Sequence, residues 1–259
     1  MEKTNKLQPF KMHANLYFIG TEAVSVHLLE TAQGLVLIDT GYPSMREQIL
    51  ENIEALHFSV QDICAIFHTH GHIDHFGNTQ ELAAISRAKT YISRIDNAIL
   101  TGELDLSWAK ELHLEPIPPF SCDGEIEDGQ VFSFGDTSIR FVHTPGHTEG
   151  TMSLIITLCD QTIAAMHGGI GMNSMRSEFL KQYGLSFACR EQFKDSLEKL
   201  AGEHVDLVLG NHPHQNNTLL KMQKVLSGAS SILDASEWPA FLEATKKQIE
   251  HLIETDPAL

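Results

Sequence analysis

The amino-acid sequence predicts an α+β fold of the αββα type, in which two mixed β-sheets pack face to face and helices cover their outer faces. Three observations support this prediction. Segments alternate as β block, helices, β block and helices along the 259 residues. Neither a linker nor an internal repeat divides them, so we expect residues 1–259 to form one domain. The hydrophobic content of 42% is ample for a sizeable core.

The first half of the chain begins with short strand-like runs and continues with helices. Residues 45–56 have helical spacing, because apolar residues recur on one side. We expect residues 94–123 to be less regular, because Pro116, Pro118 and Pro119 interrupt any long element. The other elements expected here are strands at 16–20, 23–29, 35–38, 63–67 and 90–92, and a helix at 79–86.

The second half has the same order of strands before helices. Gly135 and Asp136 are typical of a turn between two strands. Pro239 suits the first turn of a C-terminal helix, where its missing N–H would have no partner in any case. The expected strands are 137–142, 151–158, 162–165 and 205–209, and the expected helices are 192–200, 215–226 and 238–253.

Residues 68–75 contain four histidines and one aspartate, which are common ligands of zinc and related metals. His70 and His72 are two residues apart, so in an extended segment they point the same way and can share one ion. Asp74 and His75 follow where the chain should turn into a helix, so this pair can face a second ion. We interpret His68 as structural, because it lies at the end of the expected strand.

These residues are part of a set of motifs that resembles the metallo-β-lactamase superfamily. The family signature His-x-His-x-Asp-His stands at residues 70–75. An apolar strand ending in Asp-Thr-Gly stands at 34–41, the sequence Thr-Pro-Gly-His-Thr-Glu-Gly at 144–150, and Gly-Asn-His-Pro at 210–213. The motifs are in the family's order and span roughly residues 15–215. The resemblance implies the metallo-β-lactamase-like αββα fold.

The resemblance also implies a ligand set. The first metal would be bound by His70, His72 and His147, and the second by Asp74, His75 and His212. We expect Zn²⁺, two ions per chain or one, with a bridging water or hydroxide as the nucleophile. Asp74 would orient this nucleophile and could pass its proton to the leaving group. His214 competes with His212 as a ligand, but the His-Pro dipeptide favours His212.

One motif departs from the pattern of many relatives. Glyoxalase II-like thioesterases and lactonases carry a bridging aspartate after the strand that follows the third motif, and residues 162–171 here contain no Asp, Glu or Cys. His167 lies at or beside the expected position. Either His167 replaces the aspartate as a ligand, or water alone bridges the ions. The second pattern is similar to the third subclass of metallo-β-lactamases, which uses three protein ligands per ion.

The expected function is that of a zinc-dependent hydrolase that cleaves an amide, ester, lactone or lactam bond of a small molecule. A glyoxalase II-like thioesterase is the alternative, although the basic C-terminal region expected of one is missing from residues 238–259. An iron-dependent oxidoreductase of the same fold and a non-catalytic binding module are weaker alternatives. We also expect residues 168–190, which combine glycines with large apolar residues, to form a wall of the substrate pocket, unless they are an ordinary packed helix.

Composition limits the partners and the compartment. With 18 Lys and Arg against 34 Asp and Glu, the formal charge of −16 argues against nucleic acid as a partner. No apolar run is long enough to span a membrane, and the N-terminus lacks the apolar core of a signal peptide. The four cysteines show no CxxC pair and suit a reducing compartment. We therefore expect a cytoplasmic protein, and the sequence leaves its oligomeric state open.

Overall fold

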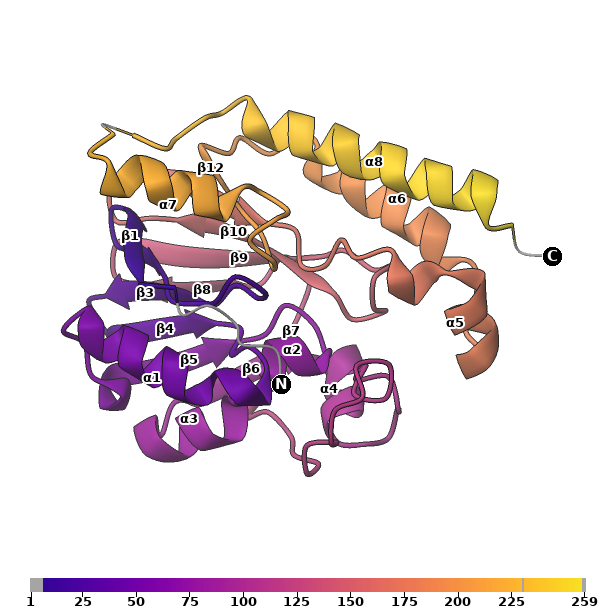
Figure 1. Cartoon of the computed structure of the whole chain (residues 1–259), viewed down its shortest axis with the longest axis horizontal. Coiled ribbons are helices and arrows are strands. Elements are labelled where there is room, and N and C mark those ends of the chain that lie inside the picture. The colour runs from indigo at the N-terminus through magenta and orange to yellow at the C-terminus, as the bar shows by residue number, and fades with distance from the viewer. Residues whose placement is uncertain (1–6, 230, 258–259) are drawn as a thin grey trace.

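Two mixed β-sheets lie face to face between two layers of helices, as the sequence predicts (Figure 1). The computed structural model describes residues 7–229 and 231–257. The first sheet has the strand order β1 (Phe10–His13), β2 (Leu16–Phe18), β3 (His27–Thr31), β4 (Gly34–Ile38), β5 (Ile63–Phe67), β6 (Lys89–Ser93) and β7 (Gly124–Ile126). The second has the order β12 (Leu207–Leu209), β11 (Ile163–Met166), β10 (Met152–Thr157), β9 (Thr137–His143) and β8 (Val131–Phe134).

The helices connect these strands and then complete the outer layers. The α-helices are α1 (Arg46–Ala55), α2 (Ile73–Phe76), α3 (Thr79–Ser86), α4 (Arg94–Leu100), α5 (Ser177–Tyr183), α6 (Cys189–Leu200), α7 (Thr218–Leu226) and α8 (Glu237–Thr255). Three short 3-10 helices are η1 (Pro43–Met45), η2 (Val60–Asp62) and η3 (Asn173–Met175). Strands β4 to β7 pair in parallel, as do β11 and β12, and the other pairs are antiparallel.

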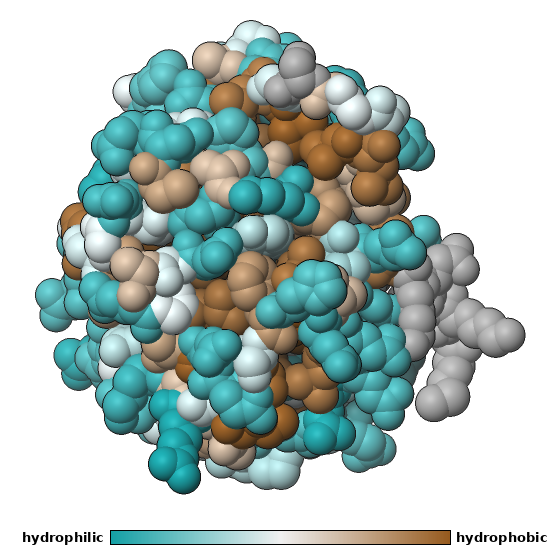
Figure 2. All heavy atoms as spheres, turned by 90° about the vertical axis from the view of Figure 1, so that its left-hand side faces the viewer, coloured by the Kyte–Doolittle hydropathy of each residue, from teal (hydrophilic) through white to brown (hydrophobic). Residues whose placement is uncertain are grey.

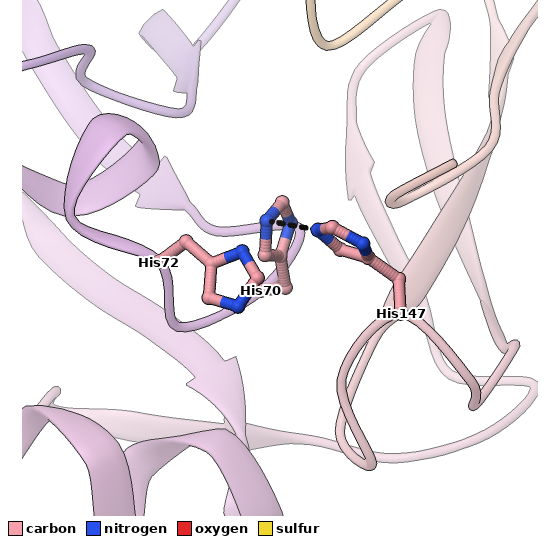
Figure 3. A group of neighbouring side chains, drawn as sticks. All are labelled: His70, His72 and His147. Carbon is pink, nitrogen blue, oxygen red and sulfur yellow. Dashed lines mark hydrogen bonds between the residues drawn. The ribbon is translucent and has the colours of Figure 1, made fainter. Parts of the chain in front are cut away.

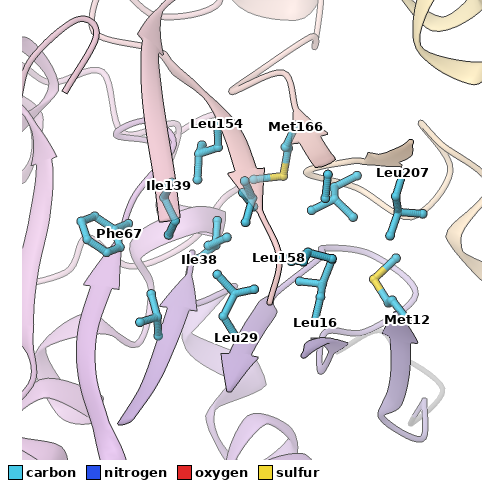
Figure 4. Packing of buried hydrophobic residues seen from close by; sticks show 14 of the residues in the cluster. Met12, Leu16, Leu29, Ile38, Phe67, Ile139, Leu154, Leu158, Met166 and Leu207 are labelled. Carbon is cyan, nitrogen blue, oxygen red and sulfur yellow. The ribbon is translucent and has the colours of Figure 1, made fainter. Parts of the chain in front are cut away.

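The alternation of side chains along the strands builds three apolar layers. Val36 and Ile38 of β4 point into the core between the sheets, and Figure 4 shows such side chains meeting from both sheets. Leu35 and Leu37 point the other way and pack with residues of α1 and α3. The outer face of the second sheet is covered in the same way, since Ile155 of β10 packs with residues of α6 and α8. Both sheets are therefore buried on their two faces, which explains their continuous apolar runs.

The carboxyl ends of several strands meet at one edge of the sandwich. Strands β4 and β5 are parallel, so Asp39 and His68 follow them at the same edge. Strand β12 is parallel to β11 and delivers residues 210–212. In such folds ligands bind in the crevice beyond the carboxyl ends of the strands. The topology therefore gathers the motifs described above at one edge of the sandwich.

Some elements differ from the sequence prediction. Helix α4 lies where we expected an irregular segment, because Ser93 caps it by accepting a hydrogen bond from the backbone of Asp96 at 3.2 Å and the prolines lie beyond its end. Strand β1 was not expected, and it gains its structure from pairing with β2. Strand β3 begins at His27 rather than at residue 23, because residues 21–24 form a turn.

The surface carries both hydrophilic and apolar residues. Figure 2 shows the side of the molecule that lies at the left of Figure 1, where hydrophilic residues cover much of the surface and apolar residues gather in places, most clearly at the upper right. Leu220 and Leu226 of α7 are 54% and 63% exposed. No helix in the described part of the chain is both long and apolar enough to cross a membrane.

A substitution at Phe67 can test the packing between the sheets. Its ring is fully buried and lies within 6.2 Å of four other aromatic rings. We expect Phe67→Ala to lower the free energy of unfolding by about 3–5 kcal/mol in urea denaturation, through lost burial and the remaining cavity. Val131→Ala, at a side chain that is 52% exposed, should change it by less than about 0.5 kcal/mol. Equal effects at both positions would contradict this packing.

Candidate metal centre

The loop after β5 carries the histidine-rich motif and is held by a buried carboxylate. Asp39 accepts hydrogen bonds from the backbone N–H of Thr69 at 2.9 Å and from its hydroxyl at 2.9 Å. Asp39 has a left-handed backbone with φ of 61°, which turns the chain sharply at the end of β4. His72 is still extended, and α2 begins at the next residue. The change of backbone separates His70 and His72 from the pair that follows.

A second buried carboxylate joins this loop to the turn that carries His147. Asp96 of α4 accepts hydrogen bonds from Gly71 N–H at 2.8 Å, Gly150 N–H at 2.9 Å and the Thr148 hydroxyl at 2.7 Å. The approach is so close that a Cβ on Gly150 would lie 2.4 Å from the Asp96 carboxylate. Asp96 therefore fixes two loops, one from each sheet, relative to each other.

The loop after β12 supplies the last candidate ligand. His212 donates from Nδ1 to the carbonyl of Ala23 at 2.8 Å. The side-chain amide of Asn211 donates to the Thr69 hydroxyl at 3.2 Å and to the carbonyl of Gly168 at 3.1 Å. These contacts attach the loop to the histidine-rich segment and orient the ring of His212.

His70, His72 and His147 form the first group of candidate ligands, and their rings converge in Figure 3. Each pair of ring centroids is 4.6 Å apart. The Nε2 atoms of His70 and His147 are 3.2 Å apart. Two ligands of a tetrahedral zinc ion, each about 2.0–2.1 Å from the metal, lie about 3.3 Å from each other. The arrangement therefore fits a zinc ion among the three rings.

Asp74, His75 and His212 form the second group. The Asp74 carboxylate lies 3.3 Å from Nε2 of His75 and 3.5 Å from Nε2 of His212. His75 donates from Nδ1 to Asp39 at 2.8 Å, which leaves Nε2 facing Asp74. The rings of His70 and His75 are 4.2 Å apart, so the two groups adjoin. Among the described residues, no carboxylate is common to the two groups.

Burial and charge set different protonation states in the two groups. Burial lowers the pKa of His147 to about 4 and holds those of His70 and His72 well below the ordinary value. Burial would also lower the pKa of His75, but the carboxylates of Asp74 and Asp39 outweigh it and raise the pKa to about 10. The first group therefore presents neutral imidazoles at pH 7. In the second group, the two carboxylates keep a proton, and with it a positive charge, on His75.

His167 lies outside both groups. Its Nδ1 accepts a hydrogen bond from Gly169 N–H at 3.2 Å, and its buried Nε2 has no partner. Its ring packs 5.4 Å from that of Phe193. A role of His167 as a ligand therefore stays a prediction. His68 is buried and its Nε2 is 3.0 Å from the Thr79 hydroxyl, in keeping with the structural role expected for it.

A small cavity opens onto both groups of ligands. Its volume is about 170 Å³, and the residues that complete its wall are Tyr42, Trp108, Leu112, Gly171 and Asn173. The ring of Trp108 lies 5.6 Å from that of His72. The sequence analysis did not single out Trp108 or Asp96, because both lie in the segment expected to be irregular. The residues that line the cavity include no Lys or Arg within the described chain.

The model of the metallo-beta-lactamase superfamily matches residues 19–160, which is more than half of the chain. The matched region contains the histidine-rich motif and the turn with His147. The chain therefore belongs to the metallo-beta-lactamase superfamily, and the family assigned from its motifs is confirmed.

Solved structures of this family superpose on nearly the whole chain. A motif mutant of the metallo-beta-lactamase from Cronobacter sakazakii is 28% identical, with a TM-score of 0.87 over 97% of this chain and 99% of that one. A subclass B3 metallo-beta-lactamase of Bradyrhizobium japonicum is 25% identical, with a TM-score of 0.88 over 98% of this chain and 97% of that one. The αββα fold and the likeness to the third subclass agree with these structures.

Curated relatives match shorter parts. A hydroxyacylglutathione hydrolase of Maricaulis maris is 34% identical over 34% of this chain and 27% of its own length. A protein of Bacillus velezensis named "probable polyketide biosynthesis zinc-dependent hydrolase" is 32% identical over 40% of this chain and 39% of its own length. Two uncharacterized relatives are matched over 61% and 69% of their lengths. The family, the fold and these hydrolase-named relatives support a metallo-hydrolase.

The two protonation states predict different proton release on metal binding. The first zinc ion should displace no proton from its ligands at pH 7, because the pKa of His147 is about 4 and those of His70 and His72 are also lowered. The second should displace about one proton from His75, whose pKa of about 10 keeps it charged. Calorimetric titration with zinc in buffers of different ionisation enthalpy measures this release. His75→Ala should remove the proton release that accompanies the second ion, and equal release in both steps of the unaltered protein would contradict the assignment.

A substitution at Asp96 can test whether its hydrogen bonds hold the loops that carry Gly71 and Gly150. Asp96→Asn leaves an amide that cannot accept from Gly71, Gly150 and Thr148 together, so the first group loses its fixed geometry. We expect the affinity for zinc to fall about 10–100-fold in competition with a chelator. Asp123→Asn is the matched control, because Asp123 also accepts from a backbone N–H, that of Thr90, but contacts neither loop. A similar loss in the control would show a general effect on stability instead.

Proposed function

We propose that this chain is a zinc-dependent hydrolase that binds two zinc ions and cleaves an amide, ester, lactone or lactam bond of a small molecule. The observation that carries the proposal is the presence of two adjoining groups of three ligand atoms beside a cavity of about 170 Å³. Histidine and carboxylate ligands suit zinc, and a zinc-dependent hydrolase of Bacillus velezensis is a relative.

When bound, zinc would polarise the scissile carbonyl and lower the pKa of water toward 7. The residues of the chain supply the geometry. Asp39 and Ala23 hold the distal nitrogens of His75 and His212, so that both rings present Nε2 to the same point. Asp74 is 7% exposed and lines the cavity, and its carboxylate is the group placed to accept a proton from water and pass it to the leaving group.

Two observations favour this reaction class over a thioesterase. No carboxylate among the described residues is shared by the two groups, as the subclass pattern with three ligands per ion requires. The cavity wall offers no Lys or Arg to bind the carboxylates of a glutathione thioester. A thioesterase is nevertheless the second candidate, because a hydroxyacylglutathione hydrolase is a relative.

We further propose that residues 1–259 act as one domain in the cytoplasm. The four cysteines are free, and free thiols suit a reducing compartment. The formal charge of −16 supports a small molecule rather than nucleic acid as the partner.

Metal analysis and one substitution test the proposal. Elemental analysis of protein purified without added metal should give two zinc ions per chain, and chelation should abolish hydrolysis until zinc is restored. Asp74→Asn should lower kcat for the best lactam, lactone, ester or thioester by about 10²–10⁴-fold, because the proton acceptor is lost. Zinc content is measured on the same sample, since Asp74 is also a candidate ligand.

Asp62→Asn serves as the control, because Asp62 is an exposed aspartate away from the cavity. Its activity and zinc content should equal those of the unaltered protein. Iron in place of zinc would overturn the proposal, and a thioester cleaved faster than every lactam, lactone and ester would favour the second candidate.

A further inference from the structure

A second and larger cavity lies against the metal centre. Its volume is about 270 Å³, and His72 and His147 form part of its wall. The same two histidines line the cavity of the metal centre. A molecule with its reactive bond at the metals could therefore extend past these rings into the second cavity.

Besides His72 and residues 146–149, two segments from different parts of the chain form most of the wall of this cavity. Helix α4 and the loop after it contribute Ile95, Ile99, Leu104 and Leu106. On the opposite side, the segment from α5 to the start of α6 contributes Phe179, Leu180, Leu185 and Cys189. Helices α4 and α5 lie in the right-hand half of Figure 1. Residues 168–190 were expected to wall a substrate pocket, and part of that segment lines this cavity.

Asp96 and Ser174 in the wall are engaged with the protein, whereas Glu149 and Gln192, which also line the cavity, are exposed. Asp96 is 1% exposed and accepts from Gly71, Gly150 and Thr148. The hydroxyl of Ser174 donates to the carbonyl of His147 at 2.7 Å. No Lys or Arg of the described chain lines the cavity, so nothing in its wall would neutralise an anionic group. The wall is suited to hydrocarbon.

The rim of the cavity is unusually apolar for a surface. Eight large apolar side chains of the described chain are exposed, and two of them belong to this cavity. They are Ile95 and Leu104, which are 37% and 42% exposed. Exposed apolar residues gathered at one place are typical of a binding site rather than of an ordinary surface.

We propose that this cavity binds an apolar, uncharged acyl chain of the substrate, next to the bond that is cleaved at the metal centre. This inference rests on the proposed hydrolase function and adds a substrate class to it, namely acyl compounds with an apolar chain. Cavities that hold whole drug-sized ligands measure about 300–1,000 Å³. A cavity of about 270 Å³ suits one substituent of such a molecule.

The first test uses p-nitrophenyl esters with acyl chains from acetate to octanoate and the zinc-loaded enzyme. We expect kcat/KM to rise about fourfold for each methylene group that enters the cavity, which is the ratio that burial of a methylene gives. Leu104→Asp places a carboxylate in the apolar wall and should remove this dependence on chain length. Leu114→Asp is the matched control, because Leu114 is 36% exposed in the same loop but lines neither cavity.

The second test does not depend on hydrolysis. Cys189 lines the cavity, and burial raises the pKa of its thiol. Its alkylation by iodoacetamide, followed by mass spectrometry of the Cys189 peptide, should slow as 1-octanol fills the cavity and remain unchanged with 1-propanol. Protection by 1-octanol should be lost in Leu104→Asp and kept in Leu114→Asp.

The two tests separate the inference from the function on which it rests. Protection of Cys189 without hydrolysis of any ester would support the cavity assignment and count against ester hydrolysis by this chain. Hydrolysis that is equal for all chain lengths, together with no protection of Cys189, would overturn the inference and leave the hydrolase proposal intact. Equal losses in both aspartate variants would also overturn it, because the effect would not be specific to the cavity.

Discussion

The geometry of the metal centre depends on two buried carboxylates that form hydrogen bonds between separate loops. Asp96 accepts from Gly71 and Gly150, which belong to loops of different sheets. Asp39 joins the end of β4 to Thr69 and to His75. A buried carboxylate must be satisfied by several donors, because an unsatisfied buried polar group costs about 1–3 kcal/mol or more when charged. Each loop therefore has one favourable position, and the candidate ligands are positioned with it.

The two groups of ligands differ in charge although they adjoin. The first consists of three imidazoles, two of which come from one loop and one from another. The second contains the carboxylate of Asp74, and one of its two histidines, His75, is held by the further carboxylate of Asp39. A cation bound in either group would change the pKa values in the other, because their rings are as close as 4.2 Å. The two sites form one coupled electrostatic system.

The sequence predicted most of the strands and helices, because they depend on local pattern, and the resemblance of its motifs to the family supplied the six principal candidate ligands that lie together in two groups. Helix α3 has the expected limits of 79–86, and the strand at 63–67 is β5. The contacts of Asp96 could not be predicted, since its three donors are 25, 52 and 54 residues away along the chain. The second cavity was predicted only in part, because its wall combines residues 95–106 with residues 174–192. Long-range packing, rather than local propensity, decides these features.

The three histidines of the first group come from two different sheets, and this has a consequence for stability. His70 and His72 follow a strand of one sheet, whereas His147 follows a strand of the other, as Figure 3 shows. An ion held by all three would fasten the two halves of the sandwich together at one edge, much as a disulfide would. The halves could not separate there without releasing it. Resistance to unfolding would then follow the supply of free metal, with about 1.4 kcal/mol gained for each tenfold rise above the dissociation constant.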